Sequence, residues 1–437
     1  MKKYIILALL FIPFIIEAQE TLSLKKCLEI AMQNNYSLKI SRNTGEIAEN
    51  NVSRANAGYL PTLSADASYS GTLNDSWQEN VSGEKISTSG IHNQTFNIGT
   101  NLSWNIFQGF RVSTTYDRLK ELNAIGELDT QVSIETMIAS ITNEYYNYVR
   151  QKQRYFNFEY VLSLSRERLR ITETQYQLGA RSKLEVLQAR VDFNADSSNL
   201  VNQQQVVLSS ATNLKTLMGS TISLEEQIEV DTLAIDINST LEYNNLLDQS
   251  LNGNTSLLTA ARNTAISELD LKIVRSRVLP YLRANAGYGY THYRYGNSST
   301  KINENLGLNY GLTLGINIFD GFNHQRNMKN ARLEIKNKEL RYQELEQDVR
   351  AGLFETYNSY QNNLQLLNLE RMNVAVAREN YEIAMERYKL GSLAGIELRE
   401  AQKSFQDAEE RMLLIEYQTK ANEISLMRIS GRLMEYL

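Results

Sequence analysis

The strongest constraint on the fold of this chain is a long internal repeat. The segment from Asn105 to Phe110 reads NIFQGF, and the segment from Asn317 to Phe322, 212 residues later, reads NIFDGF. The register holds without gaps from position 105 to position 219, which indicates duplication, so each half is expected to form the same unit. The same offset relates many identical pairs, among them Tyr145 and Tyr357, Tyr176 and Tyr388, Glu185 and Glu397, and Gly219 and Gly431.

Each half reads as helix, strand, loop, strand, very long helix, tight turn and return helix. Pro61 and Pro280 lie at the same elbow before the first strand, where the offset is 219. Proline lacks an amide hydrogen and biases the preceding residue toward extended backbone, so both helices should end there. We predict repeats at 19–219 and 241–437, strands at 62–73, 94–106, 281–293 and 306–318, loops at 74–93 and 294–305, and an acidic linker forming a belt at 220–240.

The helices predict long apolar seams. An opening helix is expected over 22–57, long helices over 108–176 and 320–388, and a return helix over 182–217. The long helices would each reach about 100 Å at ~1.5 Å per residue. Opening and return helices stacked end to end would match that length, giving two columns per half. Apolar residues recur in steps of three and four, as in coiled coils: Ile134, Ile138, Ile141, Tyr145 and Tyr148, then Leu353, Tyr357, Tyr360, Leu364 and Leu367.

The strand segments have an apolar and a polar face. In 306–318, large apolar residues alternate with Gly, Asn and Thr, and period two places the two sets on opposite faces. The alternative is a half-buried strand of a soluble sandwich. The length exceeds the usual five or six residues, and the polar face of 94–106 and 306–318 is small and uncharged. Both features favour a membrane strand facing a wet lumen.

Aromatic side chains gather where these strands end, and such residues favour the membrane–water interface. The predicted interface aromatics are Trp104, Phe107, Phe110, Phe319 and Phe322.

Four strands are too few to close a barrel, and an open sheet edge is not tolerated in lipid. The chain is therefore expected to oligomerise.

The first residues predict an export signal at 1–18. A basic start, Lys2 and Lys3, precedes an apolar run over 4–16 and a small residue, Ala18, at the expected cleavage point. The alternative is a membrane anchor, which the short run disfavours. Beyond it, no apolar run is long enough for an inner-membrane helix.

Composition excludes several function classes. The net charge of −5, with both signs interspersed, argues against a nucleic-acid partner. The single cysteine, Cys27, excludes an internal disulfide framework. The three histidines, His92, His292 and His324, are far apart in sequence, so no metal site is expected. No nucleophile–base arrangement or phosphate-binding loop is present, so we expect neither an enzyme nor a cofactor.

The order of helix, strands and helix, twice over, is accompanied by short motifs. These are Leu24-x-x-Cys27-Leu28-x-x-Ala31-x-x-Asn34-Asn35, Leu60-Pro61-x-Leu63, Asn105-Ile106-Phe107-Gln108-Gly109, and the Tyr-x-Leu-Gly turns ending at Gly179 and Gly391. With this order and these motifs, the chain resembles the TolC-like outer-membrane efflux family from about Leu22 to its end.

The resemblance implies a mixed α/β membrane protein that forms a homotrimer. Four strands per chain would give a twelve-stranded β-barrel in outer-membrane lipid, continuous with a periplasmic α-helical barrel of twelve columns. It implies a passive exit duct of a tripartite efflux or type I secretion system. A periplasmic adaptor protein would link the duct to an inner-membrane pump.

The resemblance also implies site residues. The helix tips that would meet the adaptor are Leu178, Gly179, Leu390 and Gly391. Glu397 and Glu400 stand where the family often places acidic residues that line the periplasmic entrance; the alternative is a solvated helix face. The first repeat has Glu185 but Gln188, and position 393 is Leu where some relatives have a basic residue, so a closing network here must differ.

Two rival functions are a coiled-coil scaffold or adhesion protein and a simple porin. A scaffold would explain the helical seams without requiring strands that face lipid. A porin would explain the strands without requiring helices of about 100 Å. The transported substrate cannot be read from the sequence.

Overall fold

A computed structural model describes residues 22–219, 223–224, 228–230 and 234–437. The predicted signal peptide and parts of the predicted linker lie outside the described residues. The chain divides into two compact units. One, the strand unit, comprises 42–130 and 256–346, and the other, the tip unit, comprises the described residues up to 41 with 131–255 and 347–437.

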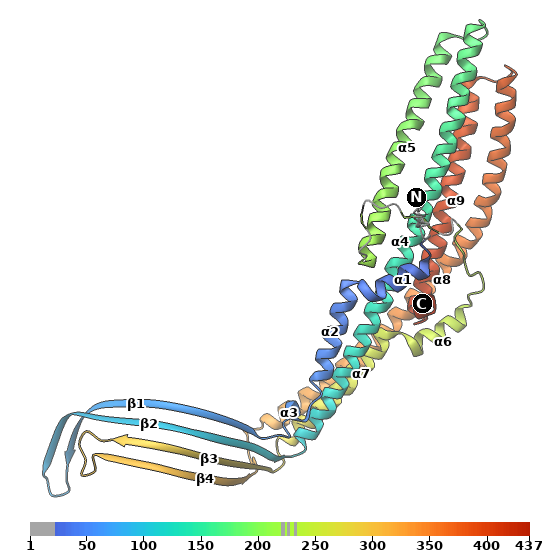
Figure 1. Cartoon of the computed structure of the whole chain (residues 1–437). Helices are drawn as coiled ribbons and strands as arrows, with labels where there is room; N and C mark the ends of the chain where they lie inside the picture. The colour runs from blue at the N-terminus through green and yellow to red at the C-terminus, as the bar shows by residue number, and fades with distance from the viewer. Residues whose placement is uncertain (1–21, 220–222, 225–227, 231–233) are drawn as a thin grey trace, which may run out of the picture. The chain divides into compact units, whose positions relative to one another are not determined.

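The strand unit contains a four-stranded antiparallel sheet in the order β1-β2-β3-β4 (Figure 1). Leu63 pairs with Leu102, Leu102 with Ala286, and Ala286 with Tyr310. Residues paired across antiparallel strands point to the same side, so all four strands share one apolar face. The strands are β1 (Thr62–Glu79), β2 (Lys85–Gln108), β3 (Tyr281–Arg294) and β4 (Ile302–Gly315).

The predicted polar loop at 74–93 was wrong. β1 continues to Glu79 and β2 begins at Lys85, so the turn comprises only residues 80–84. Trp77 pairs with Ser87 inside this extension. The Ser, Asn and Gly content resembles a loop, but backbone pairing does not depend on apolar side chains. The second loop is likewise shorter than predicted, and β4 lies a few residues earlier than 306–318.

The helices span most of the remaining described chain. α4 and α8 each run through residues of both units, and α2 also crosses the boundary. None of the helices in the described part of the chain has the length and apolar character needed to cross a bilayer. The elements are α1 (Leu24–Asn34), α2 (Tyr36–Asn50), α3 (Arg54–Ala57), α4 (Arg111–Gln177), α5 (Lys183–Met218), α6 (Tyr243–Gly253), α7 (Thr255–Ser276), α8 (Asn323–Lys389), α9 (Gly395–Ile429) and the 3₁₀ helix η1 (Leu433–Tyr436).

The single opening helix predicted over 22–57 was wrong, because it is three helices. Asn35 ends α1 with a non-helical backbone (φ −57°, ψ 122°), and its side-chain oxygen accepts a hydrogen bond from the Leu38 N–H in the first turn of α2. Its amide group also donates to the Leu217 carbonyl at 2.7 Å. Asn254 separates α6 from α7 in the second half and donates to the Ile429 carbonyl at 3.1 Å. Each break thus ties a helix junction to the end of a return helix.

The predicted helical seams form the core of the tip unit. Ile138, Ile141 and Tyr145 of α4 are buried, as are Leu353 and Tyr360 of α8. A second buried cluster, around Tyr381, Tyr388 and Phe405, lies near the helix tips. In α8, buried residues recur at spacings of seven or fourteen positions: Leu353, Tyr360, Leu367, Tyr381 and Tyr388. The burial predicted for Leu353, Tyr360 and Leu367 of the seam is confirmed.

Tyrosine hydroxyls fix the described part of the linker against the long helices. Tyr148 of α4 donates to the Ile228 carbonyl at 2.6 Å, and burial raises the pKa of Tyr148 to about 12. Tyr360 of α8 donates to the Asn238 carbonyl, and Tyr357 donates to the Leu241 carbonyl. These bonds satisfy buried phenols while holding the segment in place. The predicted belt around a tunnel stays a prediction.

Candidate functional site

The sheet presents large apolar side chains to its surroundings. On β4, Leu308 is 64% exposed, Tyr310 82% and Leu312 72%. Leu63, Tyr69 and Leu73 of β1 are also exposed. Continuous exposed apolar surface of this kind marks contact with another protein or with a membrane. The opposite face carries Asn and Gly. An uncharged polar face was predicted from the segments of β2 and β4, and β1 and β3 add two charged residues to it, Asp66 and Arg283.

The predicted interface aromatics form matching pairs at the ends of β2 and β4. Phe107 and Phe110 meet edge to face at 5.2 Å between ring centroids, and Phe319 and Phe322 do so at 5.3 Å. Phe110 and Phe322 have φ of 68° and 64°, which non-glycine residues rarely adopt. Trp104 donates its indole N–H to the Tyr59 carbonyl at 2.8 Å. All five are exposed, and their place at a membrane interface stays a prediction.

The two predicted tips are turns of the same construction. Gly179 and Gly391 have φ of 76° and 75°, in the left-handed region that favours glycine. The Gly179 N–H donates to the Tyr176 carbonyl and the Ala180 N–H to the Gln175 carbonyl, which is a Schellman cap. The second turn repeats both bonds at Gly391 and Ser392. The capped turns leave Leu178 and Leu390 exposed by 78% and 82%.

One member of the predicted acidic pair, Glu397, has a structural role. The Glu397 carboxylate accepts the Ala394 N–H at 3.1 Å and so caps the start of α9. Glu185 caps α5 in the same way, at Ser182, whose hydroxyl accepts the Glu185 N–H in return. The Ser182 backbone N–H, with Arg181, holds the pKa of Glu185 below its usual value. Glu397 and Glu400 are exposed, and their role in lining an entrance stays untested.

Arg181 joins the two tips and was not singled out from the sequence. Its guanidinium bonds Glu185 at 2.7 Å and donates to the Leu393 carbonyl of the other turn at 3.0 Å. It also lies 4.8 Å from the ring centre of Tyr388, which is within cation–π range. The side chain is only 11% exposed. A single arginine thus fixes the α4–α5 turn against the α8–α9 turn.

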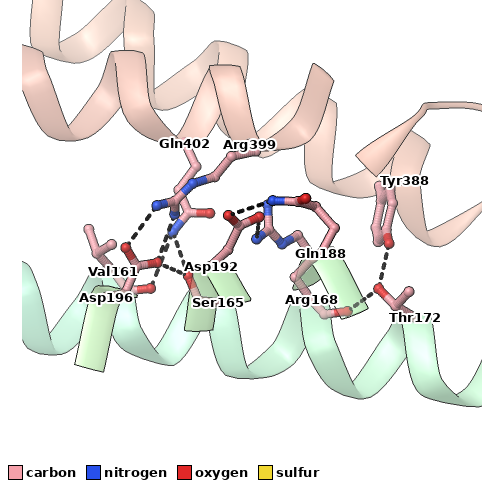
Figure 2. A network of polar contacts seen from close by, with 10 residues as sticks. All are labelled: Val161, Ser165, Arg168, Thr172, Gln188, Asp192, Asp196, Tyr388, Arg399 and Gln402. Carbon is pink, nitrogen blue, oxygen red and sulfur yellow. Dashed lines mark hydrogen bonds and ion pairs between the residues drawn. The ribbon is translucent and has the colours of Figure 1, made fainter. Parts of the chain in front are cut away.

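A buried polar network continues this connection below the tips (Figure 2). Arg399 of α9 bonds both carboxylate oxygens of Asp196 of α5, at 2.7 and 2.9 Å. Ser165 of α4 donates to Asp196 and accepts from Gln402 of α9 at 2.9 Å. Asp196, Ser165 and Gln402 are almost fully buried. Three helices from both hairpins therefore share one set of satisfied polar groups.

A second part of the network lies closer to the tips (Figure 2). Arg168 of α4 pairs with Asp192 of α5 at 2.5 Å, and Gln188 donates to the same carboxylate at 3.2 Å. Thr172 shares a 2.6 Å hydrogen bond with the Tyr388 hydroxyl of α8. These contacts border an apolar groove of about 270 Å³ between the starts of α5 and α9.

This network was not predicted from the sequence, although a signal for it was present. Asp196 and Gln203 of α5 are buried, and they follow buried Ala189 at intervals of seven residues. Polar residues at buried heptad positions predict partners on facing helices. The identity of the partner Arg399 depends on how α5 and α9 meet, which no local pattern encodes.

Among the residues that the structure describes, no group of three or more His, Cys, Asp or Glu side chains could hold a metal ion. The three histidines are separate, and His292 pairs with Glu304 at 3.0 Å across β3 and β4.

Comparison with known proteins identifies similar chains. The model of the family described as "Outer membrane efflux protein" matches residues 27–220 and 246–432. Outer membrane protein TolC of Vibrio cholerae serotype O1 is 23% identical over 230 residues, which are 53% of this chain and 51% of that protein. TolC of Salmonella enteritidis is 19% identical over 427 residues, covering 94% of this chain and 82% of that protein.

Solved structures show the same fold. The CmeC outer membrane channel of Campylobacter jejuni superposes with a TM-score of 0.74 at 18% sequence identity. The match covers 94% of this chain and 85% of that one. The mixed fold predicted from the sequence, with four strands and mostly helices per chain, is thus confirmed.

Proposed function

The chain belongs to the outer membrane efflux protein family, and from that premise we propose that three copies form the exit duct of a tripartite export assembly. Membership places it in the outer membrane as a passive channel and not an enzyme. The proposal adds the trimer, the route through it and the partners at its tips.

The observation that carries the proposal is the open, apolar-faced sheet. Among the described strands, β1 pairs only with β2 and β4 only with β3, so both edges have unpaired backbone groups. Such edges are not tolerated in lipid, where no water can satisfy them. Pairing β4 of one copy with β1 of the next satisfies both edges. Three copies would close a twelve-stranded barrel, with the apolar face toward lipid and the Asn and Gly face toward water.

The helices of the tip unit support the same assembly. Besides its buried seam, α8 has an exposed apolar stripe at seven-residue intervals, Leu369, Val376 and Ile383, and Leu390 continues this spacing into the turn that follows. α5 has another at Leu187, Val201 and Leu208, which are spaced by multiples of seven. Heptad stripes are typical of helices that pack against other helices. The proposed contact joins α5 of one copy to α8 of its neighbour.

The exposed tips are the proposed contacts with a periplasmic adaptor. Leu178 and Leu390 offer apolar side chains on turns whose backbone groups are satisfied within the chain. Arg181 holds the two turns together, so a partner would meet a preformed surface. An inner-membrane pump joined through the adaptor would deliver and select cargo for efflux or type I secretion.

At the proposed entrance, Glu400 is the cleaner candidate for a pore-lining charge. Glu397 already caps α9, whereas the Glu400 side chain has no such role in the structure. Repeated in three copies, both carboxylates would attract cations. We expect Glu397→Gln with Glu400→Gln to reduce cation preference in single-channel recordings. Unchanged ion selectivity in that double variant would remove the assignment.

The test of the duct is direct. Full-length protein extracted from outer membranes should run as a heat-sensitive trimer in detergent and should open pores in planar lipid bilayers. A water-soluble monomer, or a trimer that never conducts ions, would contradict the proposal. A water-soluble monomer would favour a scaffold over a channel.

A further inference from the structure

A small groove with three arginines lies in the strand unit, where β2 turns into α4 beside the elbow between α7 and β3. Its volume is about 210 Å³. Gly109, with φ of 57°, forms the turn so close to α7 that an added Cβ would lie 2.6 Å from the Ser276 carbonyl oxygen. This close approach brings the start of α4 next to the end of α7. The groove is lined by Gln108, Arg111, Ser276, Arg277, Leu279, Tyr281 and Arg283.

The three arginines lack acidic partners. Among the described residues, no carboxylate lies within ion-pair distance of Arg111, Arg277 or Arg283. The only side-chain hydrogen bond of this set is from Arg283 to the Asn105 amide oxygen, at 3.3 Å. Elsewhere in the same unit, Arg118 pairs with Asp270 at 2.9 Å. Three like charges around one groove repel one another unless an anion lies among them.

The internal repeat indicates that these charges are not required for the elbow. The positions that correspond to Arg111, Arg277 and Arg283 in the other half are Asn323, Gly58 and Ser64. Asn323 lies at the corresponding turn between β4 and α8. Gly58 lies at the corresponding turn between α3 and β1, and Ser64 lies near the start of β1. The fold therefore forms the corresponding turns without any of the three charges.

Gln108, which lines the groove, has a side-chain acceptor with no partner. The Gln108 side-chain oxygen is buried and receives no hydrogen bond within the described structure. Buried polar atoms are usually satisfied, so this one fits a ligand that carries an O–H donor. Hydrogen phosphate has both an O–H donor and charged oxygens, and arginine guanidinium groups bind such oxygens strongly.

We propose that Arg111, Arg277, Arg283 and Gln108 form a binding site for a water-borne oxyanion of the hydrogen phosphate or phosphomonoester class. Arg283 shares the polar sheet face with Asn285 and opposes Asn105, whereas its neighbour Leu282 belongs to the apolar face. Placement on the polar face selects a dissolved anion over a lipid headgroup. The inference rests on the proposed duct, in which this face would contact the conducted solution.

The binding test uses full-length protein in detergent and inorganic phosphate as the probe. Phosphate titrated against chloride at equal ionic strength should raise the unfolding temperature, because a ligand that binds the folded state stabilises it. Arg277→Gln with Arg283→Gln should weaken the apparent affinity at least ~10-fold, as expected when charged hydrogen bonds are lost. Lys85→Gln is the matched control, because it removes one exposed positive charge at the other end of β2.

Three outcomes of this titration would overturn the site. They are no phosphate response in the wild-type chain, an equal response in the double variant, and an equal loss in the Lys85→Gln control. A response to micelles containing phosphatidic acid, with none to inorganic phosphate, would overturn the assignment to a dissolved anion.

Reversal potentials separate this inference from the duct itself. If the wild-type trimer conducts ions, the ion selectivity of the Arg277→Gln, Arg283→Gln double variant should shift toward cations. The selectivity of the Lys85→Gln control should not shift. Conducting pores with unchanged selectivity and no phosphate binding would remove the site and leave the duct. Phosphate binding by protein that never conducts would remove the duct and leave the site.

Discussion

The sheet and the helical core place the same kinds of side chain in opposite environments. Leu308 and Leu312 of β4 are 64% and 72% exposed, whereas Leu353 and Tyr360 of α8 are fully buried. Both sets are regular in sequence, with period two in the strand and seven in the helix. One chain is thus patterned for two different surroundings. Its helices hide apolar surface from water, and its strands present such surface outward, as lipid would require.

The largest effect should come from charging the exposed face of β4. We expect Leu308→Arg with Leu312→Arg to abolish stable assembly, because each arginine near the middle of a bilayer costs about 2–4 kcal/mol. The yield of folded, heat-sensitive trimer in outer-membrane extracts measures the effect. Gly307→Arg with Asn309→Arg, on the polar face of the same strand, is the matched control and should still assemble, because a Cβ at position 307 would meet no atom within 4 Å. Equal loss of trimer in both variants would contradict different environments for the two faces of β4.

Truncation in the buried seam should have the next largest effect. Tyr360→Ala removes a fully buried ring and is expected to cost about 3–5 kcal/mol. Tyr360→Phe keeps the ring but leaves the Asn238 carbonyl without its donor, so about 1–2 kcal/mol is expected. Thermal unfolding followed by circular dichroism in detergent gives both values. Equal midpoints for the two variants would show that ring packing is not the stabilising term.

The buried network offers a third comparison, between polar and apolar parts of the helical core. Asp196→Ala should destabilise the protein by about 3 kcal/mol, because Arg399 would lose its partner in a largely buried position. Asp407→Ala, on an exposed part of α9, is the control and should change the unfolding free energy by less than about 0.5 kcal/mol. Equal unfolding midpoints for the two variants would assign the network no stabilising role.

The smallest effect concerns pH. Burial raises the pKa of Glu409 and of Glu416 in α9 despite their pairing with Arg378 and Arg371. A raised pKa means that the folded state binds the proton more tightly. The wild type should therefore gain stability relative to Glu409→Gln with Glu416→Gln as pH falls toward the raised pKa, and lose that gain as pH rises through it. Between pH 7 and pH 5, the difference in unfolding free energy between the two proteins should change by less than about 1 kcal/mol. A wild type that loses stability relative to the variant as pH falls would contradict the burial effect.

Features that depend on a local period could be predicted from the sequence. The alternation in β4, the seam through Tyr360 and the capped turns at Gly179 and Gly391 all have local signals. Features that depend on distant contacts could not. The break at Asn35 requires the carbonyl of Leu217, and the role of Asp196 requires Arg399 on another hairpin. The extension of β1 and β2 also escaped prediction, because strand pairing tolerates the Ser and Asn residues that usually indicate a loop.

In the proposed duct, the apolar face of β4 contacts lipid while its polar face contacts water. Cysteines placed singly at Leu308 and Asn309, in a Cys27→Ala background, can carry an environment-sensitive fluorophore in the assembled protein. Brominated lipid should quench the probe at position 308, and aqueous iodide the probe at position 309. Quenching of both by iodide alone would contradict the account.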